Sequence, residues 1–131
     1  MKNETIQWIK YANENLISSK ILLERNLFNP SLQNAQQCCE KYIKAYLIEY
    51  NFKLQKTHSI LSLNEILKNK DIFLNITEDD IDLIDSIYLT SKYPLGSVLP
   101  NFEPDKTICI KCIDIATTIE NDIKYYLKIS N

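Results

Sequence analysis

The segment that decides the fold is Asn34-Ala-Gln-Gln-Cys-Cys-Glu-Lys-Tyr-Ile-Lys-Ala-Tyr-Leu47. Small, apolar and aromatic side chains recur along it in steps of three and four residues, as at Ala35, Cys39 and Tyr42. This is the spacing of one face of an α-helix. Further apolar residues widen that face, so we expect much of this helix to be buried.

The same periodicity predicts four more helices. The five predicted helices run from about Thr5 to Leu27, Pro30 to Tyr50, His58 to Asn69, after Thr77 to near Ser91, and near Pro104 to Leu127. Asn29 is expected to cap the second helix, with Pro30 as its first residue, and Thr57 to cap the third. The run from Thr77 to Asp80 is close to a capping box.

Few residues favour tight turns, because the 131 residues include one Gly and four Pro. No strand, repeat or linker pattern is evident. The chain is therefore predicted to be a single domain, residues 1–131. Its expected fold is all-α, an antiparallel up-and-down bundle of four long helices plus a short fifth helix.

The charge pattern excludes a general DNA-binding protein. The net charge is −2, the isoelectric point is about 5.4, and Arg25 is the only arginine, so we expect no broad cationic surface. The polar start at Met1 predicts no signal peptide, and no apolar run reaches the ~20 residues that span a bilayer. We expect a cytoplasmic protein whose four cysteines stay reduced.

Polar residues on the second helix make a candidate site. Glu40, Lys41 and Lys44 are either a solvated face or a basic lip for a phosphate-bearing ligand. Glu40 and Lys44 are four residues apart in the favourable order, which is worth ~0.3 kcal/mol on an exposed helix. His58 either makes a local hydrogen bond at a helix start or contacts a nucleotide. Glu40 is the carboxylate that could approach it in space.

Neither metal nor cofactor chemistry is expected. Cys109 and Cys112 share a helix face, but Cys38 and Cys39 diverge by one residue's rotation. No further His or Cys is nearby in the sequence, and all four thiols fit apolar seams. With one glycine in the chain, a glycine-rich phosphate loop is nearly excluded.

Several motifs, taken in order, resemble those of the HEPN domain family (higher eukaryotes and prokaryotes nucleotide-binding). The resemblance covers nearly the whole chain. The motifs are Trp8-Ile-Lys-Tyr-Ala12 in the first helix, Glu40-Lys41 with Lys44-Ala45 in the second, Thr57-His58 before a leucine run, and Lys92-Tyr93-Pro94 after the fourth.

The resemblance implies a helical bundle that is often dimeric and often pairs with a small nucleotidyltransferase as toxin and antitoxin. Catalytic members cut RNA through an Arg-x4-6-His motif, with His as acid or base and Arg on the phosphate. This chain departs from that motif, because Arg25 and His58 fall in different predicted helices. Lys92 stands where the turn would otherwise have arginine, and lysine cannot reproduce the planar guanidinium fork.

We therefore predict a non-catalytic protein with no catalytic residues. It is expected to form a homodimer and to bind a nucleotide, a minimal nucleotidyltransferase partner, or both. The predicted cleft residues are Glu40, Lys41, Lys44, His58, Lys92 and Tyr93. Two alternatives remain open: a ribonuclease with a rewritten site that uses His58 and a nearby lysine, and a structural module without a ligand.

Overall fold

The computed structural model describes residues 1–53, 56–92 and 103–129, and within them the ordered structure is helical without strands. The helices are α1 (Asn3–Glu24), α2 (Phe28–Glu49), α3 (Ile60–Lys68), α4 (Glu78–Lys92) and α6 (Lys106–Leu127). The predicted all-α class is confirmed.

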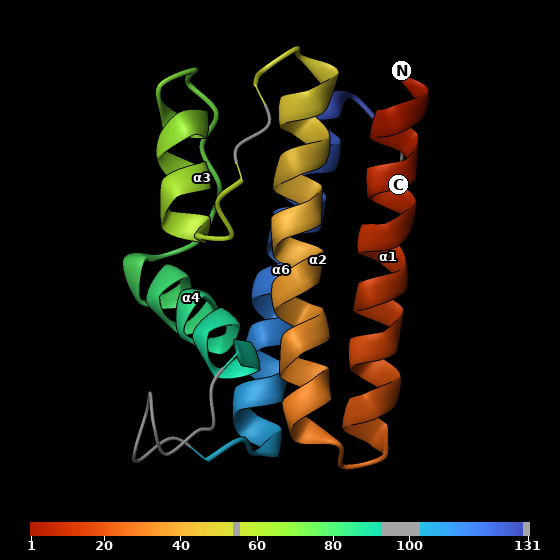
Figure 1. Cartoon of the computed structure of the whole chain (residues 1–131), viewed down its shortest axis with the longest axis vertical. Coiled ribbons are helices and arrows are strands. Elements are labelled where there is room, and N and C mark those ends of the chain that lie inside the picture. Colours follow the sequence, from red (N-terminus) through yellow and green to blue (C-terminus); the bar gives the residue numbers. More distant parts are fainter. Residues whose placement is uncertain (54–55, 93–102, 130–131) are drawn as a thin grey trace.

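The helices form an up-and-down bundle around α2. Figure 1 shows α1, α2, α4 and α6 alternating in direction, with the short α3 inserted between α2 and α4. Helix α2 contacts each of the other four helices. The shorter α4 is inclined to the three long helices, and its inclination places one of its faces over the middle of α2.

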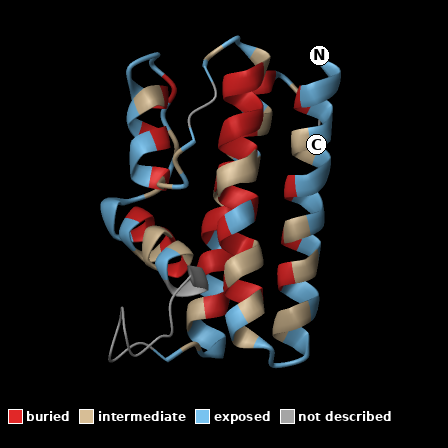
Figure 2. Cartoon of the chain, viewed as in Figure 1, coloured by how far each residue is buried: buried red, intermediate tan, exposed pale blue. Residues whose placement is uncertain are grey.

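Burial explains the central place of α2. Of its 22 residues, 13 are buried, whereas α1 buries four of 22. Figure 2 shows this contrast along the two helices. A helix that is apolar on most of its circumference must be covered on several sides. Residues 34–47 of α2 are therefore the centre of the core.

Helix α6 closes the core against α2. Ile115, Ile119 and Ile123 lie four residues apart and are all buried, and a fully buried side chain of this size contributes ~1.5–3 kcal/mol. Beside this stripe, the Tyr42 hydroxyl donates to Glu120 Oε2 at 2.8 Å. Burial, followed by this carboxylate, raises the pKa of Tyr42 well above its usual value.

Two buried serines fix the contact between α1 and α2. Ser19 Oγ donates to the carbonyl of Ser31 at 2.7 Å, and Ser31 Oγ donates to the carbonyl of Ser19 at 2.8 Å. Small side chains let the helices approach closely, and the reciprocal bonds leave neither buried hydroxyl unsatisfied.

Two predicted helix starts are wrong. Helix α2 begins at Phe28, so Asn29 is inside the helix and does not cap it. Pro30 is still tolerated because the N–H groups of the first turn have no intrahelical partner. Helix α3 begins at Ile60, where Ser59 Oγ, and not Thr57, accepts from the helix. His58 therefore lies in the connection before α3.

The predicted capping box at α4 is confirmed. Thr77 Oγ1 accepts from the Asp80 N–H at 3.1 Å, and Asp80 Oδ2 accepts from the Thr77 N–H at 3.0 Å. Burial alone would raise the pKa of Asp80, but its hydrogen bonds with Thr77 and with the Lys111 ammonium outweigh burial and lower it. This carboxylate therefore stabilises the fold in its charged form.

Candidate functional site

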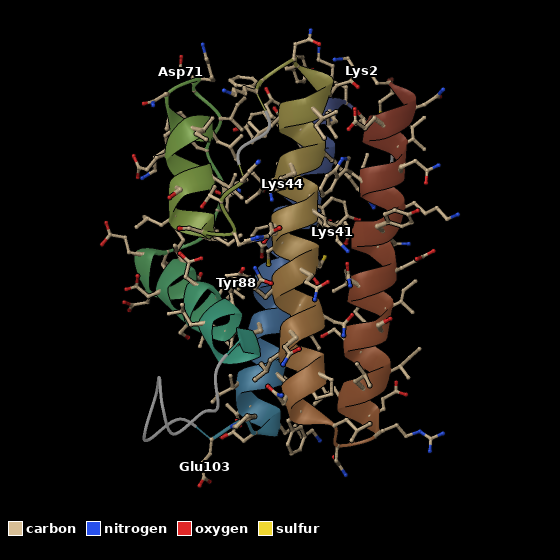
Figure 3. All side chains as sticks on the ribbon, viewed as in Figure 1. Lys2, Lys41, Lys44, Asp71, Tyr88 and Glu103 are labelled. Carbon is tan, nitrogen blue, oxygen red and sulfur yellow. The ribbon has the colours of Figure 1, made fainter. Side chains whose placement is uncertain are left out.

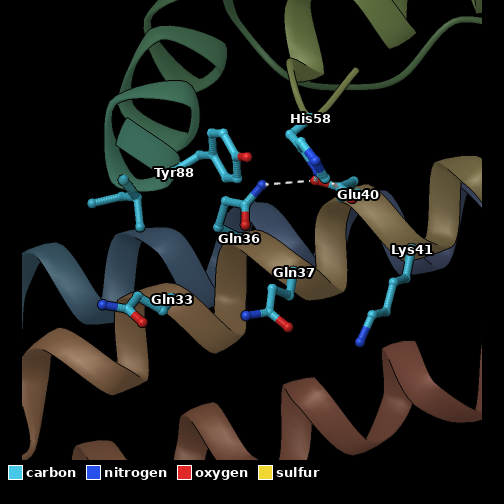
Figure 4. Close-up of a pocket in the computed structure, with 8 residues that line it drawn as sticks. Gln33, Gln36, Gln37, Glu40, Lys41, His58 and Tyr88 are labelled. Atoms are coloured by element: carbon cyan, nitrogen blue, oxygen red, sulfur yellow. Dashed lines mark hydrogen bonds and ion pairs between the residues drawn. The ribbon is translucent and has the colours of Figure 1, made fainter. Parts of the chain in front are cut away.

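The candidate site is a pocket where α2, α4 and the connection before α3 meet. Its volume is about 260 Å³. Figure 3 labels Lys41 and Lys44 on α2 and Tyr88 on α4, and Figure 4 shows the pocket in close-up. The lining residues are Gln33, Gln36, Gln37, Glu40 and Lys41 of α2, Ile87 and Tyr88 of α4, and His58.

Glu40 is the centre of the site. Its carboxylate accepts hydrogen bonds from Lys44 Nζ at 3.0 Å and from Gln36 Nε2 at 3.3 Å. His58 Nδ1 lies 3.1 and 3.2 Å from the two carboxylate oxygens. Glu40 therefore lies within hydrogen-bonding distance of His58, as expected from the sequence.

The ion pair between Glu40 and Lys44 is largely buried. The side chain of Lys44 is 6% exposed and that of Glu40 is 12% exposed. The solvated-face interpretation is therefore wrong for these two residues. Burying both charges has a desolvation cost, which their mutual attraction and the further hydrogen bonds to Glu40 offset.

The imidazole of His58 is positioned from two sides. Its ring stacks on Tyr88 of α4, with ring centroids 4.7 Å apart and planes at 21°. With Nδ1 facing Glu40, a proton on Nδ1 leaves Nε2 as the nitrogen that can accept one. The side chain is 46% exposed, so this second nitrogen can meet a ligand.

Asp85 of α4 holds the connection that carries His58. Its Oδ1 accepts from the Ile60 N–H at 2.7 Å, and its Oδ2 accepts from the Leu61 N–H at 3.2 Å and from Ser59 Oγ at 3.3 Å. A carboxylate at a helix N-terminus satisfies free N–H groups and opposes the helix dipole. Sequence reasoning missed Asp85 because its partners lie about 25 residues away.

Lys41 directs its charge away from Glu40. Its Nζ donates to Asn15 Oδ1 of α1 at 2.7 Å and lies 6.0 Å from the centre of the Tyr11 ring. Figure 4 shows its side chain extending towards α1. Lys41 thus borders the pocket with its stem while its ammonium group ties α2 to α1.

The structure therefore brings three of the six predicted cleft residues into direct contact, namely Glu40, Lys44 and His58. Lys92 is the last residue of α4. Tyr93 and the side chain of Lys92 lie outside the described residues.

Two kinds of chemistry lack support in the described part of the chain. No group of three or more His, Cys, Asp or Glu residues that could hold a metal ion is found there. Burial, with a smaller effect of Cys109, raises the pKa of Cys112 to about 12. Burial likewise raises the pKa of Cys38 and Cys39, so these three thiols are neutral and poor nucleophiles.

No helix in the described ranges is long and apolar enough to cross a membrane.

The fold and site define a small helical-bundle domain with a polar pocket on its central helix. The family model of the HEPN domain matches residues 6–126, and the chain therefore belongs to the HEPN family. No curated protein sequence matches the chain.

Two solved structures share the fold. The crystal structure of TT1696 from Thermus thermophilus has a TM-score of 0.76 and 21% identity, over 95% of this chain and 98% of that one. The crystal structure of ST0689, an archaeal HEPN homologue, has a TM-score of 0.70 and 22% identity, over 97% and 99% of the two chains.

Proposed function

We propose that this chain is a non-catalytic HEPN protein that binds a nucleotide, a minimal nucleotidyltransferase partner, or both. It would act in the cytoplasm as a homodimer, in a toxin–antitoxin type of pair. The observation that carries this proposal is the pocket beside α2, where a buried ion pair and a stacked imidazole form a preorganised polar site.

The positions of the single arginine and the single histidine of the chain support a non-catalytic role. Arg25 directly follows α1, in the turn before α2, whereas His58 lies in the connection between α2 and α3. Figure 1 shows that turn at the lower end of the bundle and the other connection in its upper half. Within one chain, the guanidinium is therefore not placed to stabilise phosphate charge beside this imidazole.

Calorimetry tests the proposal directly. The purified protein is titrated with ATP, and in a second experiment with a minimal nucleotidyltransferase. Binding heat with at least one of them is expected, and His58→Ala should weaken nucleotide binding. Gln7→Ala, an exposed change on α1, serves as the control and should leave binding unchanged. No heat with either ligand would count heavily against the proposal.

One observation favours a ribonuclease with a non-standard site as the second candidate. The carboxylate of Glu40 orients His58, which is an arrangement suited to general acid–base catalysis. Lys44 pairs with the same carboxylate. Because its ammonium group is buried against Glu40, it is poorly placed to meet a phosphate. Incubation with tRNA and total RNA decides between the two: cleavage that disappears in His58→Ala would establish the second candidate.

A further inference from the structure

We propose that the pocket beside α2 recognises the base of a nucleotide, specifically an adenine edge, and leaves the phosphates outside. This inference rests on the proposed nucleotide-binding function and specifies which part of the nucleotide the pocket binds. Three properties of the pocket carry it: the placement of its charges, its volume, and the carboxamides along α2.

The charges disfavour a phosphate in the pocket. The ammonium of Lys44 is buried on Glu40, and that of Lys41 is bonded to Asn15. A phosphate would have to break one of these contacts and would meet the carboxylate of Glu40 at close range. Like charges in a partly desolvated site repel strongly. The basic-lip interpretation therefore does not fit the described geometry.

The volume suits one ring system. Sites for drug-sized ligands measure ~300–1,000 Å³, and this pocket of about 260 Å³ lies below that range. A whole nucleoside triphosphate would extend beyond it, towards the neighbouring pocket of about 350 Å³ that shares His58 and Tyr88. A base could enter while its ribose and phosphates stay at the mouth.

The carboxamides of Gln33 and Gln37 provide the recognition groups. Both line the pocket, and Figure 4 shows them side by side along α2. Neither has a hydrogen-bond partner among the described residues, so each can offer one N–H donor and one C=O acceptor together. Of the two purines, adenine presents the complementary pair, an amino donor next to a ring nitrogen acceptor, and glutamine commonly bonds it in this way.

The state of Glu40 argues for adenine over guanine. The Watson–Crick edge of guanine offers two adjacent N–H donors, which a carboxylate matches best. Both oxygens of Glu40 already accept, Oε1 from Gln36 and Oε2 from Lys44, and the single Nδ1 of His58 lies 3.1 and 3.2 Å from the two oxygens. A carboxylate has about four acceptor positions. Guanine would therefore have to displace an existing bond, whereas adenine would not.

The wall opposite α2 suits a flat ring. Ile87 is fully buried and offers no exposed surface, whereas Tyr88 is partly exposed and stacks on His58. Proteins commonly place aromatic side chains against unstacked bases. An inserted base would thus have an aromatic contact with Tyr88 on one side and the carboxamides at its edge.

The experiment is a set of calorimetric titrations of the full chain with adenosine, AMP, ATP, guanosine and inorganic tripolyphosphate. We expect adenosine, AMP and ATP to bind within about threefold of one another. Guanosine should bind at least about tenfold more weakly, and tripolyphosphate should give no heat. Gln33→Ala combined with Gln37→Ala should weaken adenosine binding by about tenfold or more. Gln7→Ala, a glutamine on the exposed face of α1, is the matched control and should have no effect.

The outcomes separate this inference from the function on which it rests. Binding of ATP and tripolyphosphate without binding of adenosine would overturn adenine recognition and leave nucleotide binding intact. Equal affinities for adenosine and guanosine, or adenosine binding unchanged in the double glutamine variant, would also overturn it. The absence of binding by every nucleotide and nucleoside would overturn both proposals.

Discussion

Replacing Glu40 with an apolar residue tests whether the pair with Lys44 is a buried or a surface ion pair. In Glu40→Leu the ammonium of Lys44 would lose its only hydrogen-bond partner among the described residues, at a position where its side chain is 6% exposed. A charge left buried and unpaired is much more costly than a surface charge.

The structure sets the expected magnitude. Breaking a buried ion pair costs ~3–5 kcal/mol, and the 12% exposure of Glu40 places this pair near the lower end, at ~3 kcal/mol. The same pair on an exposed helix would contribute only ~0.3 kcal/mol. Removing both charges, with Glu40→Leu and Lys44→Met together, should bring the stability back to within ~1 kcal/mol of the parent, because no unpaired charge remains.

Urea unfolding followed by far-ultraviolet circular dichroism measures these differences. With an m-value of ~2 kcal/mol/M, a loss of ~3 kcal/mol lowers the urea midpoint by about 1.5 M. The control is Glu65→Leu, which removes an exposed partner 3.8 Å from Lys68 and should change stability by less than ~0.5 kcal/mol. If Glu40→Leu costs less than ~1 kcal/mol, or if the double variant is as unstable as the single one, the pair is not buried as described.

Four further predictions concern the bundle itself. Ala45→Glu should abolish cooperative unfolding in circular dichroism, because a carboxylate would enter a fully buried helix contact. Asp85→Ala should cost ~1–2 kcal/mol, as loss of a helix cap does, and should speed hydrogen exchange in α3 more than in α6. Asp80→Asn should destabilise the protein at pH 7. Because folding lowers this pKa, the charged carboxylate stabilises the fold above its usual pKa of 3.8, and that contribution disappears as the pH falls through the folded value. A thiol reagent at pH 8 should modify Cys112 only after unfolding, since burial raises its pKa to about 12.

Each of these predictions has a clear contrary result. An Ala45→Glu variant that melts like the parent would mean that this face of α2 is not in the core. Equal exchange rates in α3 before and after the Asp85 change would remove its role as a cap. A loss of stability on Asp80→Asn that is the same at pH 7 and at acid pH would exclude the charge effect. Rapid modification of Cys112 in the native protein would contradict its burial.

Apolar periodicity was sufficient to predict the helices because each long helix buries a regular stripe. Ile115, Ile119 and Ile123 illustrate this: all are buried in α6, where the spacing placed them. The helix starts were less predictable. Asn29-Pro30 is a common start signal, but the first turn of a helix accepts proline at more than one position, and α2 begins two residues earlier than predicted.

The candidate site was only partly predictable, since its contacts join distant parts of the chain. Glu40 and His58 are 18 residues apart and Asp85 bonds residues about 25 positions before it, and no local pattern encodes such pairs. Lys44 was misjudged for a related reason. Glu40 and Lys41, one turn before it, are polar and suggested a solvated face, but α2 is covered by other helices on several sides, so Lys44 is buried against its own Glu40.

The dependence of the core on α6 has a consequence for biosynthesis. Residues 28–49 meet their last covering helix only after the ribosome has translated about 80 more residues, as the contact between Tyr42 and Glu120 illustrates. At ~5–20 residues per second this delay is about 4–16 s. During that interval cysteine, tyrosine and isoleucine side chains of the nascent α1–α2 hairpin are exposed to solvent. This exposure makes the hairpin a substrate for chaperones until α6 emerges.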